Sequence, residues 1–75
     1  MIVPGGVYRH YKGKLYRAHA LVRHSETEAL LVYYETLYDT PLGRQWVRPA
    51  EMWNEPVEVN GQMVPRFALV EEQAQ

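Results

Sequence analysis

The sequence contains no cysteine and no long apolar run, and each absence excludes a class of protein. Without cysteine the chain can form neither a disulfide bond nor a thiolate zinc site, and it cannot use a cysteine nucleophile. No segment approaches the roughly 18 consecutive apolar residues of a membrane span. The first residues, MIVPGGVYRHYKG, lack the charged start and apolar stretch of a signal peptide. We therefore expect a cytoplasmic protein with no membrane partner.

A strong charge of either sign is also absent. The net charge is −1 over 75 residues, which argues against a protein held to nucleic acid by bulk electrostatics. The eight Lys and Arg residues are unevenly placed, however, because seven of them precede residue 49. A local basic face therefore stays open as an alternative.

Apolar residues are plentiful, at 47% of the chain, and aromatic residues make up 12%. This is the composition of a folded globular protein rather than a disordered one. The length predicts a single domain over residues 1–75, with a core over about 5–70 and a frayed tail, EEQAQ. A domain this small buries only about 60% of its unfolded surface, so we expect a dense aromatic core.

Glycine and proline divide the chain into short β-prone segments. Lys12-Gly13 is a turn signal, and Asn60-Gly61 between apolar runs is the strongest short-range signal of a hairpin. Pro49 at the start of PAEMW favours one helical turn over 49–53. The expected strands are 7–11, 15–22, 30–38, 44–48, 57–59 and 62–70.

For two of these segments, 15–22 and 30–38, the sequence pattern is also compatible with a helix. Ser25-x-x-Glu28 is a capping-box pattern, and apolar residues of 30–38 also fit a helical stripe. Strand is favoured there because valine, tyrosine and threonine are better strand formers than helix formers. In 15–22 strand is again favoured, since alternate residues would form one apolar face: Tyr16, Ala18, Ala20 and Val22.

These elements predict a mainly β protein, a small SH3-like β-barrel of five to six short strands with one short helical turn. Strands this few and short stay buried most easily when the sheet curls. Exposed strand edges tend to find partners, so the chain is expected to be a monomer or an edge-paired homodimer.

Four sequence blocks occur in order: YRHYKG (8–13), RHSETE (23–28), WVRPAEM (46–52) and VPRF (64–67). Together they resemble the bacterial family known as domain of unknown function 1653, over roughly residues 5–70. The family name states no activity. The resemblance implies a small bacterial protein or module with a mostly β structure.

The block RHSETE holds consecutive polar side chains between two apolar strands, and it is the first candidate site. Neighbouring residues of a strand face opposite ways, so His24 and Ser25 cannot act together as base and nucleophile. His24, Glu26 and Glu28 alternate and so could bind a metal, although their spacing matches no established motif. The structural alternative is a turn capped by a hydroxyl, with the two glutamates paired to arginines.

Two further segments carry candidate residues. YRHYKG interleaves aromatic and basic residues, as stacking on bases with contacts to phosphate would need, but a half-buried barrel strand has the same pattern. Arg48 is biased to an extended conformation by the following proline and would meet either an anion or the acidic pair Glu26 and Glu28. Trp46, Met52 and Trp53 are expected in the core, although either Trp46 or Val47 could line a groove, and Trp53 is also a candidate contact residue.

We therefore expect a non-catalytic binding module that needs no cofactor and no metal. Its ligand would be a protein, a peptide or a nucleotide. A module for single-stranded RNA or DNA is the alternative, since YRHYKGKLYR is rich in basic residues, and a small metal-dependent enzyme is a weaker one. The candidate binding residues are Arg9, Tyr11, Arg23, His24, Ser25, Glu26, Arg48 and Trp53.

Overall fold

The structure, a computed structural model, describes residues 2–71 and consists there of seven strands and one short helix. In chain order the elements are β1 (Val7–His10), β2 (Leu15–Arg23), β3 (Leu30–Thr36), β4 (Gln45–Pro49), α1 (Ala50–Trp53), β5 (Pro56–Val59), β6 (Gln62–Pro65) and β7 (Phe67–Glu71). The predicted mainly β class with one helical turn is confirmed.

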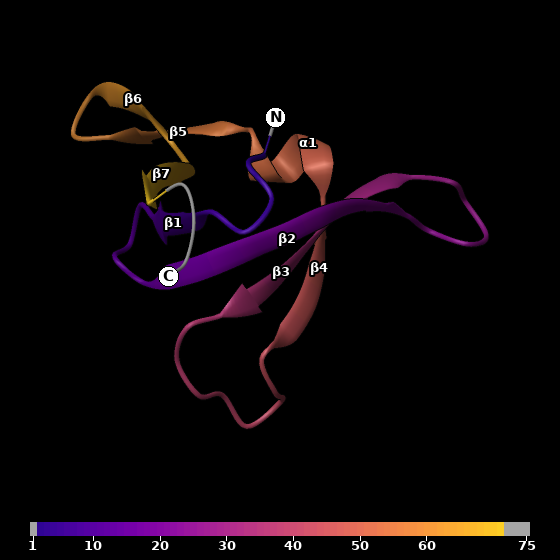
Figure 1. Cartoon of the computed structure of the whole chain (residues 1–75). Helices are drawn as coiled ribbons and strands as arrows, with labels where there is room; N and C mark the ends of the chain where they lie inside the picture. Colours follow the sequence, from indigo (N-terminus) through magenta and orange to yellow (C-terminus); the bar gives the residue numbers. More distant parts are fainter. Residues whose placement is uncertain (1, 72–75) are drawn as a thin grey trace.

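Five of the strands form one antiparallel sheet, in the order β4-β3-β2-β1-β7, and β5 and β6 form a separate hairpin that projects from it (Figure 1). Within residues 2–71 no pairing joins the edge strands β4 and β7, so the sheet is open. The closed SH3-like barrel therefore stays a prediction. No helix within the same residues has the length and apolar character needed to cross a membrane.

The segment 62–70 was expected to be one strand, and that prediction is wrong. β6 ends at Pro65 and pairs with β5, whereas β7 begins at Phe67 and pairs with β1. Proline has no backbone N–H for a strand ladder, so Pro65 ends the hairpin strand. The chain then crosses to the other sheet at Arg66, whose carbonyl oxygen accepts a hydrogen bond from the Tyr11 N–H at 2.9 Å. This split accounts for seven strands rather than five or six.

The hairpin turn itself lies where it was predicted. Asn60 and Gly61 both have positive φ, at 52° and 82°, which is the geometry that a two-residue type I′ turn requires. Gly13 has φ 109° in the β1–β2 turn, as a glycine there allows. The expected tail lies outside the described residues, apart from Glu71 at the end of β7.

The two segments with helical rivals are both strands, β2 and β3, and they pair along most of their length. The register shifts between Ala18 and Ala20, so His19 is an extra residue in a β-bulge. Ala18 therefore faces the core and is fully buried, while Ala20 and Val22 are half-exposed. The expectation of one apolar face over the even positions of β2 is wrong beyond the bulge.

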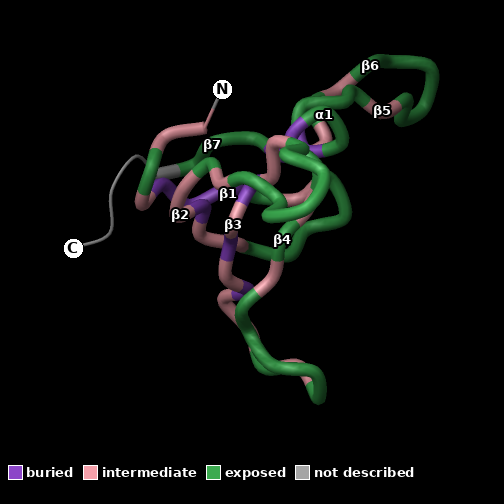
Figure 2. The backbone as a smooth tube through the Cα atoms, turned by 90° about the vertical axis from the view of Figure 1, so that its right-hand side faces the viewer, coloured by how far each residue is buried: buried purple, intermediate pink, exposed green. Residues whose placement is uncertain are grey.

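The core is aromatic, as expected, and lies between one face of the sheet and the helical turn (Figure 2). The Trp53 ring of α1 stacks on Phe67 of β7, with ring centroids 3.8 Å apart and planes 4° apart. Tyr8 and Tyr34 contact the same indole, at centroid distances of 5.5 and 5.2 Å. The buried cluster comprises Tyr8, Ala18, Val32, Tyr34, Ala50, Trp53 and Phe67.

Candidate functional site

The polar corner, residues 23–29, is an exposed turn between β2 and β3 that its own side chains and backbone close. The His24 backbone N–H donates to the Ala29 carbonyl at 2.9 Å. The His24 ring nitrogen Nδ1 accepts hydrogen bonds from the N–H groups of Glu26 and Thr27, at 3.1 and 3.3 Å. Thr27 Oγ1 accepts from the Ala29 N–H. A histidine, together with the expected hydroxyl, therefore caps this turn.

Within the described residues no ion pair joins the charged side chains of the polar corner. Arg23 donates to the Glu28 carbonyl oxygen at 3.0 Å, not to a carboxylate. Within residues 2–71 neither Glu26 nor Glu28 forms an ion pair, and no three His, Asp or Glu side chains are grouped as metal ligands. The predicted pairing of the glutamates with arginines is therefore wrong, and the metal hypothesis finds no geometric support.

Two other predicted residues lie away from this corner. Arg48 packs on the core side of the sheet, with its guanidinium carbon 5.4 Å from the centroid of the Phe67 ring. It therefore does not meet Glu26 or Glu28, because its position opposite Val32 directs it to the core face. Trp53 is 2% exposed, so it is a core residue and not a surface contact.

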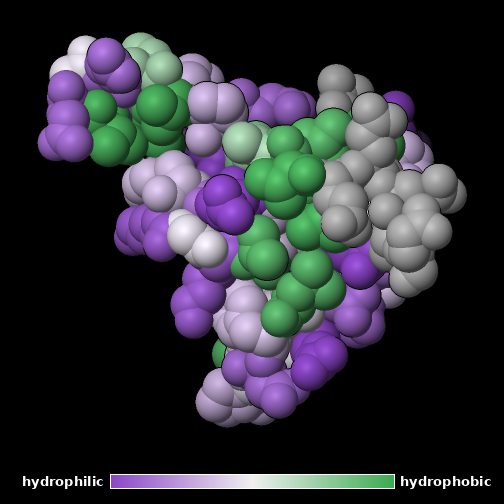
Figure 3. Space-filling view, turned by 60° about the vertical axis from the view of Figure 1, so that its left-hand side comes forward, coloured by the Kyte–Doolittle hydropathy of each residue, from purple (hydrophilic) through white to green (hydrophobic). Residues whose placement is uncertain are grey.

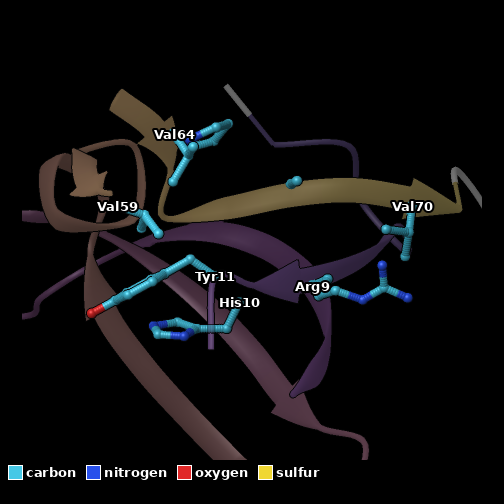
Figure 4. A pocket seen from close by; sticks show the side chains of 8 residues that line it. Arg9, His10, Tyr11, Val59, Val64 and Val70 are labelled. Carbon is cyan, nitrogen blue, oxygen red and sulfur yellow. The ribbon is translucent and has the colours of Figure 1, made fainter. Parts of the chain in front are cut away.

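The remaining predicted residues, Arg9 and Tyr11, line a groove on the other face of the sheet. The groove has a volume of about 330 Å³ and lies between β1, β7 and the projecting hairpin (Figure 4). We call it the β7 groove. Its lining residues are Arg9, His10, Tyr11, Val59, Val64, Pro65, Ala68 and Val70.

The local structure explains why these side chains meet. Arg9 pairs with Ala68 across β1 and β7, so both point to the same face of the sheet. The hairpin contributes Val59 and Val64 from above, and Val70 lies beside Arg9 at the far end (Figure 4). Apolar side chains also gather on the face that carries β7 and on the hairpin itself (Figure 3). The β7 groove thus combines apolar walls with one cation.

His10 belongs both to the β7 groove and to the aromatic layer beneath it. Its ring lies 5.0 Å from the Phe67 ring and 6.2 Å from the Tyr16 ring. Burial lowers the pKa of His10 below its usual value, and the nearby charges of Arg48, Arg66 and Lys12 lower it further. The lowered pKa favours the neutral form of the His10 ring.

Two hydrogen-bonded pairs of titratable side chains lie elsewhere in the described residues. The hydroxyl groups of Tyr16 and Tyr38 form a 2.7 Å hydrogen bond. Burial and this hydrogen bond both raise the pKa of Tyr16, so both disfavour a reactive phenolate. His19 forms a 3.0 Å pair with Glu35, and no serine or threonine hydroxyl of the described residues is hydrogen-bonded to that pair.

Most of the groove was missed at the level of sequence. Val59, Val64, Ala68 and Val70 read as ordinary strand residues, and nothing in their spacing shows that two different sheets bring them together. Pro65 was the available signal. A proline inside an expected strand indicates that the strand ends there. Because β6 ends at Pro65 and β7 begins at Phe67, the hairpin lies beside β7.

Four of the basic residues lie in three separate parts of the molecule. Lys12 and Lys14 lie over the rings of Tyr11 and Tyr38 at the β1–β2 turn, whereas Arg23 lies in the polar corner. Arg44 pairs with Asp39 in the loop between β3 and β4, at the opposite end from the hairpin (Figure 1). Within the described residues these four cations therefore do not share one face, whereas the charges of Lys12, Arg48 and Arg66 all act on His10.

Comparison with known proteins gives two matches and one negative result. A family model described as protein of unknown function DUF1653 matches residues 6–69. A crystal structure of a DUF1653 protein from Bordetella bronchiseptica is 39% identical, with a TM-score of 0.84 over 95% of this chain and 91% of that one. No curated protein matches the sequence. The predicted resemblance is thus confirmed, and the chain belongs to the DUF1653 family.

Proposed function

We propose that the protein is a non-catalytic binding module and that the β7 groove is its binding site. The proposal rests on one observation: Arg9 and several apolar side chains line the same groove, which has a volume of about 330 Å³. Ligand sites are typically mostly apolar with a few polar groups that fix orientation, and this volume is within their usual range. Two of the residues expected from the sequence to bind, Arg9 and Tyr11, are part of it.

The proposed occupant is an extended peptide segment of a partner protein. β7 pairs only with β1 among the described residues, so its second edge is free to accept another strand. Addition of a peptide strand to a free edge supplies main-chain hydrogen bonds, while side-chain pockets supply specificity. Here the apolar walls suit an aliphatic or aromatic side chain of the peptide.

Charge complementarity defines the second feature of the peptide. Arg9 is exposed and forms no ion pair with the described residues. A carboxylate on the peptide can pair with its guanidinium in a bidentate manner. The proposed motif is therefore an apolar residue with an acidic residue nearby in an extended segment. The absence of cysteine supports action in the cytoplasm.

The test is selection from a displayed library of random peptides, followed by affinity measurements with two matched variants. Ala68→Arg fills the floor of the β7 groove, and Ala29→Arg makes the same change at an exposed alanine in the polar corner. We expect enrichment of apolar–acidic peptides, loss of their binding with Ala68→Arg, and normal binding with Ala29→Arg. Equal binding by both variants, or loss with Ala29→Arg alone, would refute the groove as the site.

A binding module for single-stranded RNA or DNA remains the alternative. It is supported by Lys12 and Lys14, which lie over two tyrosine rings at the β1–β2 turn. Fluorescence anisotropy with labelled oligonucleotides at roughly 50 mM salt, where phosphate contacts are strong, tests this function separately from peptide binding. Saturable binding that Lys12→Gln with Lys14→Gln abolishes would favour it over the peptide function.

The SH3-like barrel is likewise retained as a proposal about architecture. The five-stranded antiparallel sheet, its one-sided aromatic core and the helical turn that precedes the last three strands support it. In such a barrel the β5–β6 hairpin would lie at the open side of the sheet, beside the proposed site.

A further inference from the structure

Two basic side chains contact one aromatic ring on the core side of the sheet, and the charge of a third acts on the same histidine. The guanidinium carbon of Arg48 lies 5.4 Å from the centroid of the Phe67 ring. The imidazole of His10 meets the same ring edge-on, with the centroids 5.0 Å apart and the planes at 77°. The charge of Arg66 acts on His10, as do those of Arg48 and Lys12, so Arg66 lies near the same histidine. We name His10, Arg48 and Arg66 the Phe67 cluster.

The hydrogen-bond donors of the Phe67 cluster are largely unused. Arg48 forms neither an ion pair nor a side-chain hydrogen bond with the described residues, although it has five N–H donors. Arg66 donates from Nη2 to Glu55 Oε1 at 3.0 Å, but its Nε is buried and has no acceptor there. Glu55 is 58% exposed, so water screens this ion pair and the carboxylate can be exchanged.

His10 is held so that it can donate as well. Its Nδ1 accepts a hydrogen bond from the Lys12 backbone N–H at 3.2 Å. In the neutral ring the proton then resides on Nε2, which is a donor. The bond to the Lys12 backbone also fixes the ring orientation, so the cluster is partly organised before a ligand arrives.

We propose that the Phe67 cluster binds a phosphate group, with Arg48 as the principal ligand and with His10 and Arg66 as further donors. Two guanidinium groups and the nearby Lys12 exceed the single negative charge of Glu55, which suits a dianion. The planar guanidinium fork matches phosphate oxygens, and the Phe67 ring beneath Arg48 holds that fork by cation–π contact. This site goes beyond the proposed peptide site and shares with it only His10.

A purely structural role of Arg48 makes a different prediction. If the guanidinium only covers the Phe67 ring, phosphate should leave the signals of His10 and Arg48 unchanged. If phosphate binds, the imidazole next to it gains a negative neighbour, and the pKa of His10 should rise toward its usual value. The titration of His10 with and without phosphate therefore separates the two roles.

The experiment is an NMR titration of the intact chain with inorganic phosphate at constant ionic strength, following the His10 ring and arginine side-chain signals. We expect saturable shifts, a higher His10 pKa, and affinity at least about tenfold weaker in Arg48→Gln. Arg44→Gln is the matched control, because Arg44 is paired with Asp39 in an exposed loop. Arg48→Lys keeps the charge without the fork and should retain part of the affinity.

A parallel arm with a nucleoside 5′-monophosphate distinguishes the source of the phosphate. Tighter binding than inorganic phosphate supports a nucleotide, and equal binding supports free phosphate. Absence of saturable shifts at His10, or equal affinity in Arg48→Gln and Arg44→Gln, overturns the proposal. Should Arg48→Gln fail to fold, Arg66→Lys and Arg48→Lys are compared with Arg44→Gln by the same measurement.

Discussion

Replacement of Trp53 by alanine should come close to unfolding the protein. The indole is 2% exposed and contacts Phe67, Tyr8 and Tyr34. Truncation of a buried tryptophan costs about 3–5 kcal/mol, because both the transfer energy and the packing of its neighbours are lost. A chain of this length has a total free energy of unfolding of about 4–11 kcal/mol at typical values per residue. Trp53→Ala therefore removes a large share of it.

The matched control for this change is Met52→Ala, on the same helical turn. Met52 is 43% exposed, and its truncation should change the free energy of unfolding by less than about 1 kcal/mol. Urea denaturation followed by circular dichroism gives both values. For Met52→Ala, tryptophan fluorescence in a Trp46→Phe background gives a second measurement that reports on Trp53 alone, since the chain has two tryptophans. A loss below about 1 kcal/mol in Trp53→Ala, or an equal loss in Met52→Ala, would refute the assignment of Trp53 to the core.

Further predictions concern a titration, a turn and the polar corner. The pKa of His10 is lowered below 6.5 in the folded state, so the unfolded chain binds a proton at a higher pH than the folded chain does. The free energy of unfolding should therefore fall as the pH drops below 6.5. Urea denaturation at several pH values measures this dependence, and His10→Gln should flatten it. Gly61→Val forces a β-branched residue to φ 82°, which costs about 1–3 kcal/mol, and NMR should show changes concentrated in β5 and β6. His24→Ala removes the acceptor for two N–H groups, so amide exchange at Glu26 and Thr27 should accelerate while the midpoint of urea denaturation stays nearly unchanged; a large loss of global stability would contradict the assignment of His24 to a local turn.

The fold class and most strand positions could be predicted because local signals agreed with the tertiary structure. Asn60-Gly61 adopts the positive φ angles of its turn, and the β-branched and aromatic content of 30–38 correctly outweighed a helical periodicity. The exposure of the polar corner also followed from its run of polar side chains. In each case the deciding interactions lie within a few residues of one another.

The parts that could not be predicted depend on contacts between distant segments. The bulge at His19 reverses which residues of β2 face the core, and a sequence period of two gives no sign of an inserted residue. Arg48 reads as a surface cation, but its register opposite Val32 and the ring of Phe67 draw it to the core side. The β7 groove arises only after Pro65 separates two strands into different sheets.

The strands β5 and β6 contact each other far more than either contacts any other element of the molecule. An isolated pair of strands is at best marginally stable in water, so this arm should open and reclose more often than the rest of the molecule. We therefore expect one wall of the β7 groove to adjust to a ligand, while the opposite wall belongs to the five-stranded sheet. A peptide that contacts both walls would reveal itself by slowing hydrogen exchange in β5 and β6 before it altered any strand of the main sheet.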